Sequence, residues 1–355
     1  MLEKAYPERK VEVINAAITA VNSHVMLPVA KACLEYDPDF LVVYLGNNEV
    51  AGPNAAGSLY SGYFKNLSLL RFSDSIKSLR LYQLIQVLSG RHQVASGTSK
   101  GMDFYLENSI FEDDERLQTV YRHFDRNLKD ILATAAKKDC PVLLSTVGVN
   151  LLDSPPFISR ESDNAEASYL KGLEMHEAGN DEEALISLKK ARDLDGLRLR
   201  ADSKVNAVIR QQVDGREDQV IFVDAESRFE QGKSGSLSIP GDNDFLDHVH
   251  LAFAGNYTVA NAFFEVVLSS LGSPKQTTAS MEEVASSLAY SKWDQLTLVR
   301  KVTDQILNKP PYTNQWNHAE TQLSRRRELR KLASRYTPEV IENTWELYEN
   351  ALKKE

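Results

Sequence analysis

Short apolar runs along the chain predict the strands of a parallel sheet. Each run is rich in Val, Ile and Leu and is continuous, as expected for strands that helices cover on both faces. Segments with the 3.6-residue period of a helix lie between these runs, including residues 25–36 and 117–138. Strands that alternate with helices predict βαβ units and a three-layer α/β domain. The predicted strands are residues 11–15, 40–46, 141–147 and 220–224.

Polar residues follow each of the predicted strands. In open α/β sheets, ligands bind beyond the carboxyl ends of the strands. We therefore expect a functional site in the loops that begin there. These loops begin at Asn15 and at residues 46–49, 148–150 and 224–227.

Residues 165–195 interrupt the strand and helix rhythm and predict a helical hairpin. In a single tetratricopeptide repeat, small residues let two helices approach closely and a glycine turns the chain. One repeat cannot bury its own face. We expect the hairpin either to dock on the main domain, where it would shape the rim of the site, or to bind a protein partner. The residues with this spacing are Gly172, Gly179, Ala184, Leu188 and Ala191.

These features predict a discontinuous domain organisation. The main domain comprises residues 1–160 and 199–272, and the helical insertion comprises residues 161–198. A joint rich in Gly, Ser, Pro and Thr begins at Gly272 and leads into an all-helical extension over residues 273–355. The basic run SRRRELRK in this extension is followed by acidic residues and predicts a solvated helix face.

Composition and charge narrow the class of protein. The chain has 355 residues, with 42% apolar and 26% charged residues, as in ordinary globular proteins. A net charge of -9 argues against a nucleic-acid partner, because phosphate binding needs clustered positive charge. Cys33 and Cys140 stand in apolar contexts and predict buried, inert thiols without a disulfide. No run approaches the ~20 apolar residues of a membrane span, so the chain as given is expected to be soluble.

The candidate chemistry lies in Asp247 and His250, at the start of an apolar segment that predicts a helix. A histidine with an adjacent carboxylate can act as a general base whose charged form the carboxylate stabilises. Asn48, in the loop after the second predicted strand, could supply an oxyanion donor. His248 competes with His250 for the role of base. The alternatives are that Asp247 only begins a helix and that Asn48 only caps the next turn.

Four segments together resemble a known family. They are VEVINAAITAVNSH, PDFLVVYLGNNEVAGP, IFVDAES and FLDHVHLAFAGNY. They look like the SGNH (GDSL-type) hydrolases, in particular the bacterial members that carry tetratricopeptide segments, and the resemblance covers residues 7–270. It implies a three-layer α/β/α, flavodoxin-like parallel sheet with a serine esterase site at one end.

The resemblance also implies roles for individual residues. The family joins a serine nucleophile, a backbone N–H donor, an Asn side-chain donor and an Asp-x-x-His pair. Asn48 matches the Asn block, with Glu49 where many members have Asp. Asp247 and His250 match the last block, with His250 as the base. Ala17 stands where the donor glycine is usual, so Asn48 and the N–H of Ala17 would form the oxyanion hole.

The nucleophile block of the family is absent from this chain. It should precede residues 11–15, and only MLEKAYPERK does so. We therefore expect a truncated sequence that lacks the first strand of the sheet and whose nucleophile is unknown. Unpaired strand edges would cost about 1 to 3 kcal/mol for each unsatisfied group, and the alternative is that residues 11–15 and 40–46 pair directly. The serines that lack a glycine-lined elbow and are not expected to substitute are Ser23, Ser73, Ser75 and Ser145.

The expected function follows from the resemblance. It implies hydrolysis of a carboxylic ester or acyl group, on a small-molecule or carbohydrate ester, with no metal or organic cofactor. The chain as given is expected to be inactive because it lacks the serine. The alternatives are a non-catalytic module in which the helical insertion binds a protein, and an acyltransferase to a carbohydrate. The localisation is left open, with a membrane-anchored or periplasmic parent protein as one reading.

Overall fold

The centre of the molecule is a small parallel sheet. Its strands are β1 (Leu41–Tyr44), β2 (Val142–Ser145) and β3 (Val220–Val223), in the order β1-β2-β3. Each strand lies inside one of the predicted runs, so the predicted α/β class is confirmed. The computed structural model describes residues 1–56, 66–78, 109–232, 235–272 and 279–335, together with Glu346 and Glu349.

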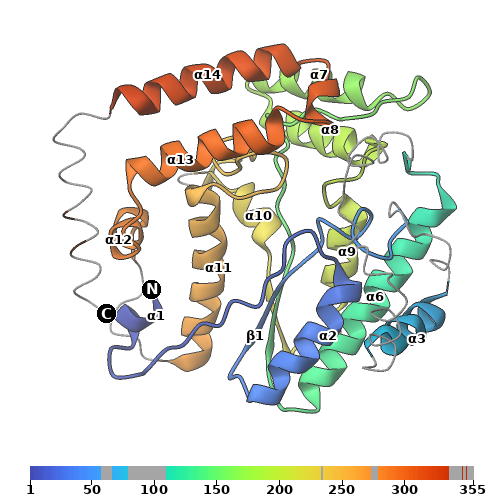
Figure 1. Ribbon diagram of the computed structural model, residues 1–355, viewed down its shortest axis with the longest axis vertical. Coiled ribbons are helices and arrows are strands. Elements are labelled where there is room, and N and C mark those ends of the chain that lie inside the picture. Colours follow the sequence, from blue (N-terminus) through green and yellow to red (C-terminus); the bar gives the residue numbers. More distant parts are fainter. Residues whose placement is uncertain are drawn as a thin grey trace, which may run out of the picture.

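Helices flank the sheet on two sides (Figure 1). On one side lie α2 (Ser23–Cys33), α6 (Glu115–Ala136) and α9 (Ser203–Gln211), and on the other lie α10 (Ala225–Phe229) and α11 (Phe253–Leu271). All four residues of β2 are buried, whereas β1 and β3 are partly exposed at the edges. The central strand is therefore the one that is fully covered, although its run also contains Ser145 and Thr146.

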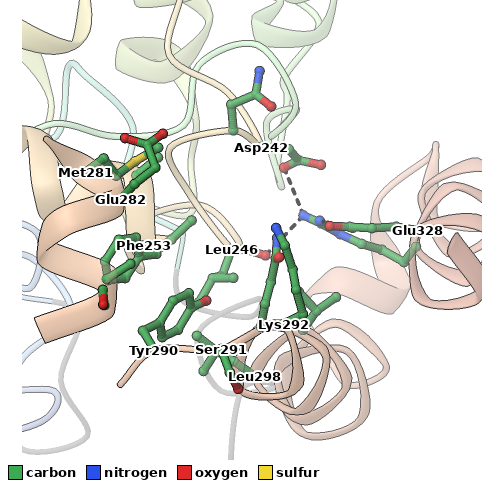
Figure 2. Close-up of a pocket in the computed structure, with 18 residues that line it drawn as sticks. Asp242, Leu246, Phe253, Met281, Glu282, Tyr290, Ser291, Lys292, Leu298 and Glu328 are labelled. Atoms are coloured by element: carbon green, nitrogen blue, oxygen red, sulfur yellow. Dashed lines mark hydrogen bonds and ion pairs between the residues drawn. The ribbon is translucent and has the colours of Figure 1, made fainter. Parts of the chain in front are cut away.

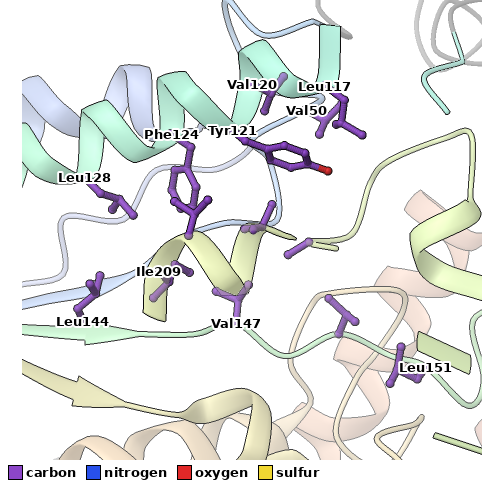
Figure 3. Packing of buried hydrophobic residues seen from close by; sticks show 14 of the residues in the cluster. Val50, Leu117, Val120, Tyr121, Phe124, Leu128, Leu144, Val147, Leu151 and Ile209 are labelled. Carbon is purple, nitrogen blue, oxygen red and sulfur yellow. The ribbon is translucent and has the colours of Figure 1, made fainter. Parts of the chain in front are cut away.

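Helix α6 supplies much of the core. Its N-cap residue Asp114 accepts a hydrogen bond from the backbone N–H of Arg116, which satisfies one free donor at the helix start. Phe124 and Leu128 lie four residues apart on one face of α6 and are almost completely buried. Figure 3 shows this face directed towards β2 and α9. The helix therefore closes one side of the sheet beneath the loops of the candidate site.

The predicted strand over residues 11–15 is wrong. These residues have no regular secondary structure, and the side chains of Val13 and Ile14 are 82% and 75% exposed. An apolar run gains strand structure only when its backbone groups find a partner. Among the described residues, β1 pairs on one edge only, with β2, and the side chain of Val42 is 54% exposed. The alternative that residues 11–15 pair with the strand at 40–46 is therefore not found either.

The predicted hairpin is formed by α7 (Ala165–Glu177) and α8 (Asp181–Leu194). A Cβ at Gly172 would lie 2.6 Å from Leu188 Cγ, so only glycine permits this helix approach. Gly179 turns the chain with a positive φ of 78°. Tyr169 and Leu188 belong to the same buried cluster as β2, and the Tyr169 hydroxyl donates to the Leu152 carbonyl oxygen. The hairpin thus docks on the main domain.

The C-terminal extension packs as helices around the main domain. Leu296, Val299 and Leu332 from this extension form a buried cluster with Phe157 and Leu246. None of the helices in the described ranges is both long and apolar enough to cross a membrane. The elements of the extension are α12 (Met281–Ser287), α13 (Lys292–Val302), the π-helical turn Thr303–Leu307, the 3-10 turn Tyr312–Asn314 and α14 (His318–Ser334).

The basic run in α14 is only partly solvated, which corrects the prediction. Arg326 and Arg327 are exposed, but Arg325 is buried. Its guanidinium donates to the Leu246 carbonyl oxygen over 3.1 Å and lies 2.9 Å from an Asp242 carboxylate oxygen. A run of like charges does not reveal that one member faces inward, because the partner that compensates it is distant in sequence.

Both cysteines are free thiols. Cys140 is buried just before β2, as predicted, and burial raises the pKa of its thiol. Cys33 is half-buried, so its predicted burial is wrong. The reason is its place at the C-terminal end of α2, where the neighbouring Lys31 and Ala32 are exposed.

Candidate functional site

Asp247 and His250 form a hydrogen-bonded pair in the loop before α11. The Asp247 carboxylate is completely buried, and its Oδ2 lies 2.7 Å from His250 Nδ1. Its Oδ1 accepts the backbone N–H groups of Val249 and His250, at 2.9 and 2.8 Å. The Asp-x-x-His spacing lets the loop wrap around one carboxylate. The His250 side chain remains 55% exposed, so the pair combines a buried acid with an accessible imidazole.

The electrostatics of the pair favour a charged carboxylate and a basic imidazole. Burial alone would raise the pKa of Asp247, but the nearby imidazole of His248 and the hydrogen-bonded imidazole of His250 hold that pKa well below its usual range. The hydrogen bond from Asp247 raises the pKa of His250 above its ordinary value. With Nδ1 held by Asp247, Nε2 is the nitrogen left for proton transfer.

The end of β2 holds the loop of the pair. The Asn150 side chain donates to the Asp247 carbonyl oxygen over 3.0 Å, and the Asn150 backbone N–H donates to the His248 carbonyl oxygen over 3.0 Å. Arg200 in turn donates to the Asn150 carbonyl oxygen over 3.0 Å. Asn150 is one of the polar residues that the sequence places at a strand end. The structure thus joins that strand end to the Asp247 loop.

Asn48 lies half-buried in the turn that follows β1. Its carbonyl oxygen accepts the N–H of Gly52 over 2.7 Å, while its neighbour Asn47 uses its side chain to accept the N–H of Ala201 over 3.0 Å. The side-chain amide of Asn48 has no hydrogen bond to any described residue, so the capping alternative is not found. This amide remains available as a donor.

Ala17 lies exposed in the segment between α1 (Leu2–Ala5) and α2. Its φ is not positive, so alanine fits this backbone without strain. Its N–H donates to the side-chain oxygen of Asn15 over 2.9 Å. In this arrangement the N–H is therefore already occupied, and the role of Ala17 in an oxyanion hole stays a prediction.

The two histidines of the loop have different surroundings. His248 is buried, its Nδ1 is hydrogen-bonded to the Tyr312 hydroxyl, and its ring meets Phe157 edge to face. His250 is exposed and is hydrogen-bonded to Asp247. His250 is therefore the histidine that can reach a ligand. Tyr312 carried no signal in the sequence, because nothing in its local pattern indicates a contact with a residue 64 positions away.

The serines named as poor substitutes for the nucleophile are used elsewhere. Ser145 is buried and donates to the Thr146 carbonyl oxygen, and Ser23 donates to Glu49. Ser73 and Ser75 lie in α3 (Leu67–Ser78), as the helical pattern indicates. Within the part of the chain that is described, the His250 imidazole has one hydrogen-bond partner, Asp247. No described serine therefore completes a triad.

A cavity of about 650 Å³ lies on the extension side of the same loop (Figure 2). Phe253 and Tyr290 stack against each other in its wall, with ring centroids 4.2 Å apart and planes at 11°. Asp242 and Leu246 line it from the loop, and Lys292 lines it from α13. The cavity therefore borders the segment that carries Asp247 without including His250.

This chain has no match that would assign a function to the site. No family model, curated protein or solved structure matches this chain. In the described ranges, no group of three or more His, Cys, Asp or Glu side chains is arranged to hold a metal ion. The chemistry that the described residues do offer is proton transfer at His250 beside the buried carboxylate of Asp247.

Asp247→Asn is expected to lower both the stability of the fold and the basicity of His250. The free energy of unfolding at pH 7 should fall by about 1 to 2 kcal/mol, because the amide gives weaker hydrogen bonds than the carboxylate. The pKa of Asp247 is lowered on folding, so this contribution is present at neutral pH and is lost as the pH falls. Urea unfolding measures the first effect, and an NMR titration of His250 measures the second.

Asp244→Asn is the matched control for this change. Asp244 lies in the same loop, and burial raises the pKa of its carboxyl, so the neutral amide removes no stabilised charge. This variant should retain the stability of the parent chain and the pKa of His250. A fall in the His250 pKa that is equal in both variants would contradict a direct role for Asp247.

Proposed function

We propose that this chain carries the acid–base pair and one oxyanion donor of an SGNH-type serine ester hydrolase. The observation that supports this most is the hydrogen bond between the buried carboxylate of Asp247 and the exposed imidazole of His250. Asn48, at the end of β1 with an unused amide, is the second support. The three-layer, flavodoxin-like sheet of SGNH type is part of the same proposal.

Each residue then has a defined step. Where a hydroxyl nucleophile is supplied, His250 Nε2 takes its proton and returns it to the leaving oxygen of the ester. Asp247 keeps the imidazole oriented and stabilises its charged form in the transition state. The amide of Asn48 donates to the oxygen that becomes negative, a contact worth about 2.7 to 4 kcal/mol of barrier. None of these steps calls for a metal ion or an organic cofactor.

We also propose that this chain alone does not hydrolyse esters. A base and an oxyanion donor do not form an acyl-enzyme without a nucleophile. No serine among the described residues is bonded to His250. The acyl group of a small-molecule or carbohydrate ester would therefore meet no serine hydroxyl held by His250 among the residues that the structure describes.

Hydrolysis of p-nitrophenyl acetate tests this proposal. The purified chain should release p-nitrophenol no faster than its His250→Ala and Asn48→Ala variants. A rate that His250→Ala abolishes would overturn the prediction of inactivity and would show that the chain contains its own nucleophile. If the rate is absent and the pKa of His250 is also not raised in the parent chain, the pair is not poised as a base and the proposal of a hydrolase site fails.

A second candidate function is a protein-interaction module built on the hairpin. The observation that favours it is the exposure of two apolar side chains there, Ile186 at 68% and Leu170 at 45%. Exposed apolar residues on paired helices are typical of protein contacts when they are contiguous. Acyl transfer to a carbohydrate would use Asp247 and His250 in the same way as ester hydrolysis. The two reactions would differ only in whether a sugar hydroxyl or water accepts the acyl group.

A further inference from the structure

Two histidines compete for one carboxylate in this loop. His250 Nδ1 lies 2.7 Å from Asp247 Oδ2, and His248 Nδ1 lies 3.4 Å from Asp247 Oδ1. If both imidazoles donated to Asp247, the carboxylate would share its charge between two donors, and its hydrogen bond with each would be weaker. The state of His248 therefore decides how fully Asp247 acts on His250.

Asp247 has little capacity left for His248. Its Oδ1 already accepts two backbone N–H groups, those of Val249 and His250. Its Oδ2 accepts the imidazole of His250. The 3.4 Å separation to His248 is longer than the 2.7 to 3.2 Å that is usual for such a bond. Oδ1, the oxygen nearest to His248, thus already accepts two hydrogen bonds without it.

Tyr312 supplies His248 with another partner. Its hydroxyl is hydrogen-bonded to His248 Nδ1 in a buried contact. Burial, together with the charge of Asp247, raises the pKa of Tyr312 well above its ordinary value, so the phenol is neutral and has a proton to donate. A ring nitrogen that accepts a hydrogen bond from a phenol carries no proton, so it cannot donate a hydrogen bond to a carboxylate.

The C-terminal extension fixes Tyr312 in this place. The Tyr312 ring meets Phe157 edge to face, with centroids 5.2 Å apart. Gln315, one turn later, donates to the Pro155 carbonyl oxygen over 2.8 Å. Arg325 in α14 donates to the Leu246 carbonyl oxygen, beside Asp247 itself. The extension therefore contacts both the segment at Pro155 and Phe157 and the loop at Leu246, two positions before His248.

We propose that Tyr312 is a positioning residue for the Asp247–His250 pair. Its hydroxyl donates to His248 Nδ1, keeps that nitrogen unprotonated and leaves His250 as the one imidazole that donates to Asp247. The C-terminal extension thereby selects which of the two histidines becomes the base. The value of this selection for catalysis rests on the proposed hydrolase function, whereas its test reads the protonation of the imidazoles and not ester hydrolysis.

Long-range ¹H–¹⁵N NMR spectra of the full chain test the assignment. His248→Gln and His250→Gln identify the two imidazoles. In the parent chain, His248 should show an unprotonated Nδ1 and His250 a protonated Nδ1. In Tyr312→Phe, which keeps the ring and removes the hydroxyl, the His248 Nδ1 signal should change to the protonated form and the pKa of His250 should fall. Tyr290→Phe, which changes a half-buried tyrosine of the extension, should leave both imidazoles as they are.

The double variant His248→Gln/Tyr312→Phe separates positioning from general loosening of the loop. It removes the competitor, so the pKa of His250 should return to its value in the parent chain. A pKa that stays low in the double variant would show that the hydroxyl acts only on the stability of the loop and would overturn the proposal. A protonated His248 Nδ1 in the parent chain would overturn it as well, and this result needs the two Gln variants only to assign the signals.

Discussion

Arg200→Met is expected to lower the free energy of unfolding by about 3 to 5 kcal/mol, because it leaves a buried carboxylate without its cation. The Arg200 side chain is 3% exposed and lies 3.4 Å from the equally buried Asp195. Its guanidinium also donates to the carbonyl oxygens of Asn150 and Ser154, over 3.0 and 2.6 Å. Met has a similar length but offers no donor, so all three acceptors lose a partner at once.

Urea unfolding at pH 7 measures this effect. The matched control is Arg126→Met, on the exposed face of α6, where the ion pair with Asp130 connects residues four apart. That change should cost no more than about 0.5 kcal/mol. The two variants lose the same charge, so equal losses of stability would show that the buried contacts of Arg200 contribute nothing beyond charge. Because Asn150 also holds the Asp247 loop, the Arg200 variant should broaden the NMR signals of His250 as well.

The central part of the sheet could be predicted from the sequence. The runs at residues 40–46, 141–147 and 220–224 became strands because each finds a neighbour and is covered by helices. The run at residues 11–15 is also rich in Val and Ile, although it contains Glu12 and Asn15, and it became an exposed, irregular segment. The composition of a run shows that its side chains can be buried. Its backbone N–H and C=O groups must also pair with a neighbouring strand. A single sequence carries only the first of these.

In the candidate site, too, some contacts could be predicted from the sequence and others could not. The contact between Asp247 and His250 could be predicted because they are three positions apart and one loop brings them together. The contacts of Tyr312 with His248 and of Arg325 with Leu246 join residues 64 and 79 positions apart, and no local pattern marks either of them. The role of the C-terminal extension as a support for the site was therefore visible only in the structure.

Glu49→Gln is expected to remove a large part of the pH dependence of stability between pH 5 and 8. Glu49 directly follows Asn48 and is 3% exposed. Burial raises the pKa of Glu49 to about 7, although its oxygens accept hydrogen bonds from the backbone and the hydroxyl of Ser23. Asn127 donates to that same hydroxyl over 2.9 Å, so the partners of the carboxylate within the described ranges are neutral groups.

The sign of this pH dependence follows from the number of protons that the folded and the unfolded chain bind. Between the unfolded pKa near 4.5 and the folded pKa of about 7, the folded chain binds the proton and the unfolded chain does not, so stability falls as the pH rises. For Glu49 this loss amounts to about 2 to 3 kcal/mol from pH 5 to pH 8. Urea unfolding at several pH values should therefore give a flatter profile for Glu49→Gln than for the parent chain. Glu35→Gln changes the net charge equally at an exposed position, and a profile flattened as much by this control would show that the effect is one of overall charge and not of the buried carboxyl beside Asn48.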